Sequence, residues 1–317
     1  MPDPEDRLSP PNTKKGRLQR VLLALHAEHR AQGMLPTTGR FLFYELEQRG
    51  DATKPSPDDQ RPNKRRQEGW PPGEQDVIDA LRDLRERGIV PWDDIADETR
   101  RLDVWQHGPS IAAGLLGRLG VTRINPWGAE PPPLILCESR AVQSVLRALA
   151  ARYVCPITGT AGQVNGFVRT RVAPALAADP ADAPVRLVLY VGDLDDQGLQ
   201  IEANTRRVQE RATGRTWGDR WRRLALTPDQ VRERGMAPIW KTDGRRRRKN
   251  EPPPPPRRAY EVEALGQRAL LDLVDAALAA LLPEPLARVL EREARQRARL
   301  RPILESLAAT EAAEDDA

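Results

Sequence analysis

The chain has 317 residues, 39% hydrophobic and 30% charged, a composition typical of a soluble protein with a sizeable core and room for two domains. No stretch approaches the roughly 20 apolar residues of a membrane helix, and no signal peptide is recognisable, so a membrane or secreted protein is not expected. The net charge of +4 comes mostly from arginine, which suits phosphate contacts. The only cysteines, Cys137 and Cys155, form no disulfide or zinc motif, which favours a reducing cytoplasm.

The first hundred residues are predicted to form a small helical domain. Residues 1–15, rich in Pro, Asp and Lys, are expected to be a disordered tail. Apolar residues at helical spacing predict helices over 16–30 and 74–87, and the apolar segment 89–92 is expected to form a short wing strand. Helices followed by a small strand are the outline of a winged helix, a common DNA-binding module, so residues 16–105 are predicted to form one.

A further helix of this domain, capped by Thr37 or Thr38 and ending near Gly50, places Arg40 and Tyr44 on one face because they are four residues apart. Taken alone, a tyrosine beside two phenylalanines is more often a core residue than a nucleophile. An arginine at such a position is more often a solvated surface charge.

The polar, Pro-rich segment 51–73 is predicted to be a loop, and the basic run in its middle is a candidate DNA contact through Lys64, Arg65 and Arg66. Residues 106–130 mix Gly, Pro and Trp and are predicted to be a linker or a docking segment.

The second half of the chain is predicted to be an α/β domain. Residues 134–138 and 185–191 are short, nearly continuous apolar runs of the kind buried on both faces of a parallel sheet. Helical patterns follow each of them, over 139–152 and 199–211. This alternation predicts a Rossmann-like, mostly parallel sheet over residues 131–282.

Carboxylates stand at the end of both predicted strands. Asp193 and Asp195 can share one face of an extended chain, and Glu138 follows the earlier strand. The carboxyl ends of parallel strands form the ligand-binding edge of such sheets, and carboxylate oxygens suit a hard cation such as Mg²⁺. An acidic turn or a helix-dipole partner is the alternative for each acid alone. A calcium loop fits poorly because Asn204 occupies the place of its final glutamate. A phosphotransferase with an Asp-x-Asp motif at a strand end is a further alternative, but the hydroxyl residue that usually follows the second acid of that motif is missing here.

These motifs carry a family resemblance. Glu138 after one strand and the sequence GDLDDQG at 192–198 after another resemble the TOPRIM domain of topoisomerases, primases and related nucleases. The whole of residues 16–282 is similar to the DNA-cleaving A subunit of type IIB topoisomerases (topoisomerase VI) and its meiotic break-forming relatives. In that family a winged helix precedes TOPRIM, and a catalytic tyrosine follows an arginine by four residues, as Tyr44 follows Arg40.

Two other stretches resemble this family. The sequence YEVEAL at 260–265 looks like the end of its fold, and residues 88–100 are similar to stand-alone versions in mobile elements and bacterial proteins. Asp196 and Gln197 depart from the residues that relatives often have there, which weakens the expectation of a strand-passing enzyme.

The resemblance implies Mg²⁺-dependent cleavage of DNA by transesterification. Tyr44 would attack a phosphodiester, Arg40 would stabilise the phosphate, and the metal would be held by Glu138, Asp193 and Asp195. Glu138 is also a candidate general acid or base. The resemblance further implies a homodimer. Because no GxxxxGK[ST] loop is present, ATP-driven strand passage would need a separate ATPase subunit. A hydrolytic TOPRIM nuclease that does not use the tyrosine, and a noncatalytic DNA-binding or regulatory protein, stay open as alternatives.

The α/β domain contains a basic excursion over residues 212–258. Its Arg220, Arg222 and Arg223 interleave with two tryptophans, a mixture suited to phosphates and base stacking, so these arginines are candidate DNA contacts. An amphipathic helix with the tryptophans in its core is the alternative. Residues 283–317 are predicted to comprise a charged helix over 283–311, either a dimer contact or simply solvated, and a disordered acidic tail over 314–317.

Overall fold

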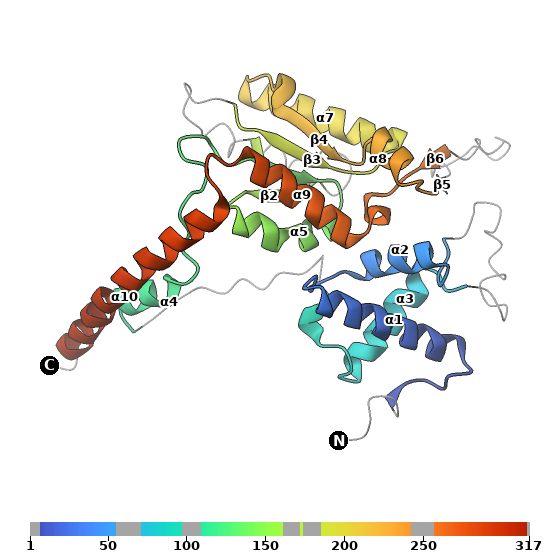
Figure 1. The fold of residues 1–317 in the computed structure, drawn as a ribbon, viewed down its shortest axis with the longest axis horizontal. Helices are drawn as coiled ribbons and strands as arrows, with labels where there is room; N and C mark the ends of the chain where they lie inside the picture. Colours follow the sequence, from blue (N-terminus) through green and yellow to red (C-terminus); the bar gives the residue numbers. More distant parts are fainter. Residues whose placement is uncertain are drawn as a thin grey trace.

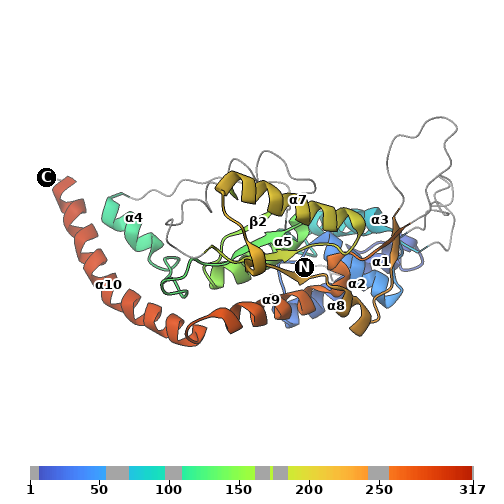
Figure 2. The same ribbon diagram turned by 90° about the horizontal axis from the view of Figure 1, so that it is seen from above.

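The computed structural model describes residues 7–54, 71–96, 109–160, 172–173, 185–241 and 257–315. They form a helical unit near the N-terminus, an α/β unit built on a parallel sheet, and a long helical arm (Figures 1 and 2). The expected mixed α/β class is confirmed. Among these residues no helix is long and apolar enough to cross a membrane. The described part of the chain does not include the candidate DNA contacts Lys64, Arg65 and Arg66.

Three helices form the N-terminal unit: α1 (Lys14–Ala31), α2 (Gly39–Arg49) and α3 (Glu74–Glu86). Thr38 caps α2 by accepting a hydrogen bond from the amide of Phe41, and Gly50 ends it in the left-handed conformation. Apolar side chains from all three helices share one core. The predicted helices are confirmed, with ends that differ from the prediction by at most two residues.

The wing strand predicted after α3 is wrong. The segment forms a bend and then η4 (Trp92–Asp94), a short 3-10 helix. The Asp94 carboxylate binds His26 at 2.8 Å and Arg30 at 2.7 Å, both on α1, and so draws the segment back onto that helix. The one β pairing described for the segment is a single bridge at Ile95.

Residues 7–13 were expected to belong to a disordered tail, and for them this prediction is wrong. The Ser9 amide donates a hydrogen bond to the buried Gln19 side chain at 2.8 Å, and the Arg7 guanidinium donates one to the carbonyl of Arg87 at 3.1 Å. The last residue of the segment caps α1 through its hydroxyl. Hydrogen bonds within the segment, to α1 and to the end of α3 therefore fix the entry to the first helix.

The α/β unit contains one four-stranded sheet, and all of its strand pairs are parallel. The strands are β1 (Leu134–Cys137), β2 (Ile157–Gly159), β3 (Val188–Val191) and β4 (Trp221–Ala225), in the order β2-β1-β3-β4. The two strands expected from apolar runs lie side by side at its centre. The expectation of a parallel sheet is confirmed, although β2 and β4 had not been recognised as strands.

Different helices cover the two faces of this sheet (Figure 1). They are α7 (Asp196–Thr213) on one face, and α5 (Arg140–Arg152) and α9 (Gln267–Leu281) on the other. Alternate residues of β1 enter the two cores: Ile135 and Cys137 lie on the α5 side, Leu134 and Leu136 on the opposite side. Burial on both faces explains why these strands are continuous apolar runs in the sequence.

The excursion 212–258 is partly an integral piece of the sheet. Trp217 and Trp221 are buried in the core beneath α7, so their interpretation as core residues is confirmed. They lie beside the short 3-10 helix η6 (Gly218–Arg220) and in β4, however, and not on an amphipathic helix. Then follow α8 (Pro228–Glu233) and an antiparallel ribbon of β5 (Ile239–Lys241) and β6 (Arg257–Ala259).

The arm consists of α10 (Leu286–Asp315) with α4 (Ile111–Arg118) packed along it (Figures 1 and 2). Its base is fixed by Glu293, which is 3% exposed and accepts hydrogen bonds from the amide of Ile124 and from Arg123. Of the two interpretations of residues 106–130, a linker or a docking segment, the structure supports docking for the described part, which packs on the arm. The helix continues to Asp315, so the prediction of a disordered tail over residues 314–317 is wrong for Glu314 and Asp315.

The N-terminal unit is joined to the α/β unit through α2 and η7 (Val262–Leu265), a 3-10 turn that follows β6. Phe41 of α2 is fully buried in the core of the α/β unit. The Gln267 side chain accepts a hydrogen bond from the Thr37 hydroxyl at 2.6 Å and donates one to the carbonyl of Met34 at 2.5 Å. These contacts place α2 directly beside the edge of the sheet where the acidic residues gather.

Candidate metal site

The acidic residues lie where the sheet topology favours a ligand. β1 continues outward to β2, and β3 continues outward to β4 on the other side, so the chain reverses its order between two neighbouring parallel strands. The crevice at the carboxyl ends of such strands is the usual binding position in open α/β sheets. Glu138 follows β1, Asp193 follows β3, and the Asp193 amide donates a hydrogen bond to Glu138 Oε2 at 3.0 Å. The expectation that these two strand ends meet is confirmed.

Asp195 serves two neighbours at once. Its Oδ1 accepts a hydrogen bond from the Gly198 amide at 2.6 Å and so caps α7, which begins at Asp196 and not after Gly198 as predicted. Its Oδ2 lies 2.8 Å from Lys241 Nζ on the ribbon strand β5. Asp195 is therefore a helix cap paired with a lysine at the rim of the site.

Among the described residues, one group of acids is close enough to share a metal ion. Asp193, Glu261 and Glu263 each offer a carboxylate oxygen, and these oxygens lie within 4.8 Å of one another. Of the three predicted ligands only Asp193 belongs to this group; Glu138 and Asp195 flank it, and their role as ligands stays a prediction. Sequence reasoning had singled out YEVEAL but not its acids as ligands. The alternation Glu-Val-Glu repeats the Asp-Leu-Asp pattern after β3 and was the available signal.

The donor set fits a hard divalent cation. All three groups are carboxylates, and oxygen is the ligand that Mg²⁺ and Ca²⁺ prefer. Glu263 is 0% exposed, and its Oε2 accepts no hydrogen bond in the described structure. An unpartnered carboxylate oxygen in a protein interior is costly, and an ion bound by the three acids would satisfy it.

Three cations frame the acids. Arg40 of α2 forms a very short contact with Glu261, and its Nε lies 2.9 Å from Glu263 Oε1. Lys54 Nζ lies 2.8 Å from Glu261 Oε1, and Lys241 Nζ lies 3.4 Å from the same atom. Burial alone would raise the pKa of Glu261, but these three cations outweigh it and lower the pKa to about 2.

The charge of the remaining acids depends on pH, because their pKa values are raised. Burial, reinforced by the charge of Asp193, raises the pKa of Glu138 to about 7. Burial also raises the pKa of Glu263 to about 7 despite the nearby Arg40, and it raises that of Asp193. When all are ionised, the five carboxylates at this edge and the three cations that contact them leave two negative charges. That excess equals the charge of one divalent ion.

Tyr44 lies in the same network, but as a buried residue. Its side chain is 0% exposed and packs edge-to-face on Phe43 in the core of the helical unit. Lys54 Nζ, which also binds Glu261, donates a hydrogen bond to its Oη at 2.8 Å. Burial, followed by the charge of Glu261, raises the pKa of Tyr44 far above its usual value. The structure thus places the predicted nucleophile close to the acids of the same chain. Its hydroxyl, however, is buried and un-ionised.

The three candidate DNA contacts of the excursion have different surroundings. Arg223 binds Glu202 at 2.7 Å and donates hydrogen bonds to the carbonyls of Gly192 and Asp193, so it supports the strand end and is wrong as a free phosphate contact. Arg220 lies 3.4 Å from Glu130. Arg222 is exposed on β4.

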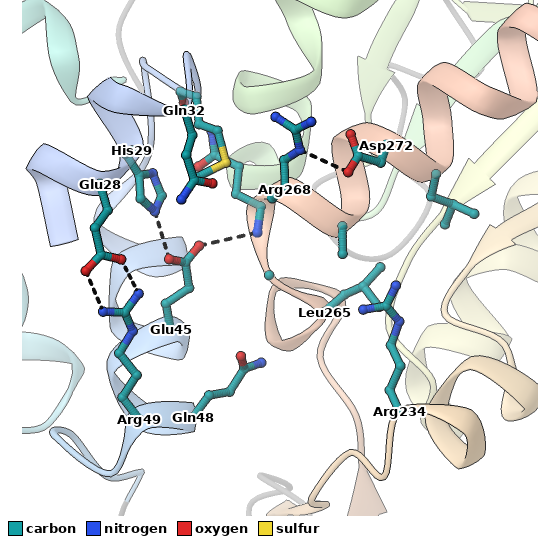
Figure 3. A pocket seen from close by; sticks show the side chains of 15 residues that line it. Glu28, His29, Gln32, Glu45, Gln48, Arg49, Arg234, Leu265, Arg268 and Asp272 are labelled. Atoms are coloured by element: carbon teal, nitrogen blue, oxygen red, sulfur yellow. Dashed lines mark hydrogen bonds and ion pairs between the residues drawn. The ribbon is translucent and has the colours of Figure 1, made fainter.

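A pocket of about 820 Å³ lies on the other side of α2, between the helical unit and α9 (Figure 3). Its charged groups pair mainly with one another: Arg49 with Glu28, Arg268 with Asp272, and His29 with Glu45. Because these charges already have partners and the three acids are not among the residues that line it, the pocket is a feature of the contact between the two units and not the candidate metal site.

Gly198 is required by a close approach at the site. A Cβ atom there would lie 2.5 Å from the Asp193 carbonyl oxygen and 3.1 Å from Glu138 Oε2. Because a backbone carbonyl cannot move aside, Gly198→Ala is expected to lower the free energy of unfolding by about 2 kcal/mol in urea denaturation. Gly114→Ala is the control: it lies within helix α4 with nothing within 4 Å, so it should gain roughly 0.5–1 kcal/mol. Equal effects at both positions would contradict the close approach.

The raised pKa of Glu138 predicts a pH-dependent penalty in the metal-free protein. Its folded pKa is about 7 against a usual 4.5, so the folded state keeps a proton that the unfolded chain releases, and stability falls as pH rises from about 4.5 to about 7. Glu138→Gln removes this penalty. Urea denaturation should show it more stable than wild type by roughly 2 kcal/mol at pH 8, with little difference at pH 5. The exposed Glu291→Gln should differ little at either pH; a pH-independent effect of Glu138→Gln would refute the assignment.

We find no match to this chain among protein-family models, curated proteins or solved structures. The functional conclusion therefore depends on the chemistry of the acidic edge itself.

Proposed function

We propose that this protein is a Mg²⁺-dependent enzyme that cleaves phosphodiester bonds in DNA. The observation that carries the proposal is the buried group of Asp193, Glu261 and Glu263, whose oxygens lie within 4.8 Å of one another and which includes an unpartnered carboxylate oxygen. In this proposal the α/β unit is a TOPRIM domain. The helical unit is a winged-helix-like domain without the predicted wing strand, and it binds the nucleic acid.

The chain supplies three kinds of group for this chemistry. Asp193, Glu261 and Glu263 would hold the ion, which when bound neutralises charge on the phosphate and on the leaving oxygen. Glu138, with a pKa of about 7, is suited to accept or donate a proton near neutral pH. Lys241 lies at the mouth of the site with a side chain 35% exposed, where it could contact a phosphate.

Hydrolysis is supported better than transesterification through Tyr44. The Tyr44 side chain has no exposed surface, and its hydroxyl is held by Lys54 with a strongly raised pKa. A tyrosine nucleophile is the second candidate, favoured by the lysine that joins its hydroxyl to Glu261. It would require α2 to open so that DNA reaches the phenol. Arg40 in that case would face the phosphate, as the family resemblance implies.

Cleavage of supercoiled plasmid and of single-stranded DNA, with Mg²⁺ or with EDTA, tests both mechanisms. Hydrolysis predicts that wild type and Tyr44→Phe cleave and that Asp193→Asn does not. Loss of cleavage in both variants, with a covalent protein–DNA adduct trapped in wild type, would instead establish the tyrosine mechanism. DNA binding without any Mg²⁺-dependent cleavage by wild type would overturn the enzyme proposal in favour of a noncatalytic role. A homodimer and an ATPase partner are not needed for these outcomes.

A further inference from the structure

The helix α10 changes the sign of its charge half-way along. Residues 286–301 contain six arginines and two glutamates, whereas residues 302–315 contain four acids and no basic residue. The reversal falls at Pro302, close to the middle of the helix. Arg295 and Arg299 on the basic half are exposed. A helix of this kind repels a parallel copy of itself and attracts an antiparallel one.

An uncovered apolar stripe is centred on the same point. Leu300, Ile303 and Leu307 are 46%, 56% and 50% exposed and recur at intervals of three and four residues, so they lie along one side of α10. Leu304, next to this stripe in the sequence, is only partly exposed. On α4, Ile111 and Leu115 are also exposed, at 79% and 53%. The arm thus presents several large apolar side chains to solvent, far from the body of the protein (Figure 2).

We propose that the arm is a homodimer interface in which the α10 helices of two copies pair antiparallel, with the two-fold axis near Ile303. In this arrangement Leu300 of one copy lies opposite Leu307 of the other, and the basic half of each helix lies opposite the acidic half of its partner. The surface is then complementary to itself, as an interface with two-fold symmetry requires. The coincidence of the apolar stripe with the charge reversal favours a second copy, because an antiparallel copy of the same helix matches both features at once. This inference is independent of the proposed function.

Analytical ultracentrifugation of the full chain over a wide concentration range tests the interface. Wild type should dimerise, and Leu300→Asp should raise the dimer Kd by about 100-fold or more because each dimer loses two buried leucines. Leu199→Asp on α7 is a matched control, since Leu199 is also 46% exposed but lies outside the arm, and it should leave Kd unchanged. High salt should weaken the dimer because the paired charges are exposed. Circular dichroism verifies that both variants fold. A monomeric wild type, or a dimer that Leu300→Asp leaves intact, overturns the proposal.

Cysteine cross-linking tests the orientation. Ile303→Cys should form a disulfide across the axis under mild oxidation. Two copies of Leu307→Cys should not, because they would lie about 12 Å apart along the helix axis. A mixture of Leu300→Cys and Leu307→Cys proteins should cross-link as a heterodimer. Cys137 and Cys155 are both buried, so wild type gives the background. Self-cross-linking of Leu307→Cys as efficient as that of Ile303→Cys would indicate parallel helices and contradict the model of pairing.

Discussion

Asp193→Asn is expected to reduce Mg²⁺-dependent DNA cleavage by about 1,000-fold or more, equivalent to roughly 4 kcal/mol of lost transition-state stabilisation. Asp193 contributes an oxygen to the three-acid group and stands at the end of the central strand β3. The asparagine keeps the shape of the side chain and can still accept the hydrogen bond from the Val262 amide, which is 3.0 Å from Oδ1. Only the charge toward the ion is removed, so the fold should persist while the ion is lost.

Asp196→Asn provides the matched control, because Asp196 is three residues away and its carboxylate is exposed and paired with Arg257. It should cleave at nearly the wild-type rate. Binding of Mn²⁺, followed by electron paramagnetic resonance without DNA, separates metal binding from catalysis. It should weaken in Asp193→Asn and not in Asp196→Asn. Full Mn²⁺ affinity in Asp193→Asn would remove this residue from the metal site, whatever happened to cleavage.

Arg40→Ala is expected to lower the free energy of unfolding by about 3 kcal/mol at pH 8 without divalent ions, measured by urea denaturation. Arg40 contacts two glutamates that are almost inaccessible to solvent, Glu261 at 3% and Glu263 at 0% exposure. Removing the guanidinium leaves Glu263 without its cation, and Glu261 keeps only its lysines. The loss should shrink below pH 7, where protonation of Glu263, whose pKa is already about 7, removes the uncompensated charge.

Arg268→Ala is the control for this prediction. Arg268 and Asp272 form an ion pair at 2.9 Å in which both side chains are 60% exposed, so its loss should cost less than about 0.5 kcal/mol. Added Mg²⁺ should recover part of the stability of Arg40→Ala, since the ion replaces the missing positive charge beside the same carboxylates. A loss as small as that of Arg268→Ala would mean that the buried glutamates are neutral in the folded protein.

Elements fixed by short-range signals were predictable from the sequence. Thr38 and Gly50 mark the ends of α2, and the apolar runs before Glu138 and Asp193 form the two central strands. Since parallel neighbours end at one edge of a sheet, the meeting of Glu138 with Asp193 also followed from the pattern.

Features that depend on distant contacts were not predictable in the same way. Glu261 and Glu263 reach the site because a bridge between Leu194 and Tyr260 ties η7 to the end of β3, across more than sixty residues of chain. The segment expected to be a linker or a docking segment contains the helix α4, whose Ala112 amide donates a hydrogen bond to Glu311 of α10, near the other end of the chain. The spacing of residues within a short stretch of sequence predicts neither of these long-range contacts.

Arg223 illustrates a third reason for error. Composition marks it as a phosphate ligand, but in the fold its guanidinium satisfies backbone carbonyls at the end of β3, one of them belonging to Asp193. A structural arginine and a surface arginine cannot be told apart in the sequence, and only the contacts that Arg223 makes with Glu202 and with backbone carbonyls distinguish it.

Glu261 belongs both to the candidate metal site and to the contact between the helical and α/β units, because Arg40 and Lys54 of the helical unit form ion pairs with it. Binding of an ion to the three acids and contact between the two units are therefore linked equilibria. A divalent ion that binds Glu261 weakens the ion pairs of Glu261 with Arg40 and Lys54, and thus the contact between the units. A polyanion whose phosphates bind Lys54 and Arg40 leaves Glu261 available to the ion. By reciprocity, DNA as the proposed substrate and a divalent ion as the proposed cofactor should each tighten the binding of the other.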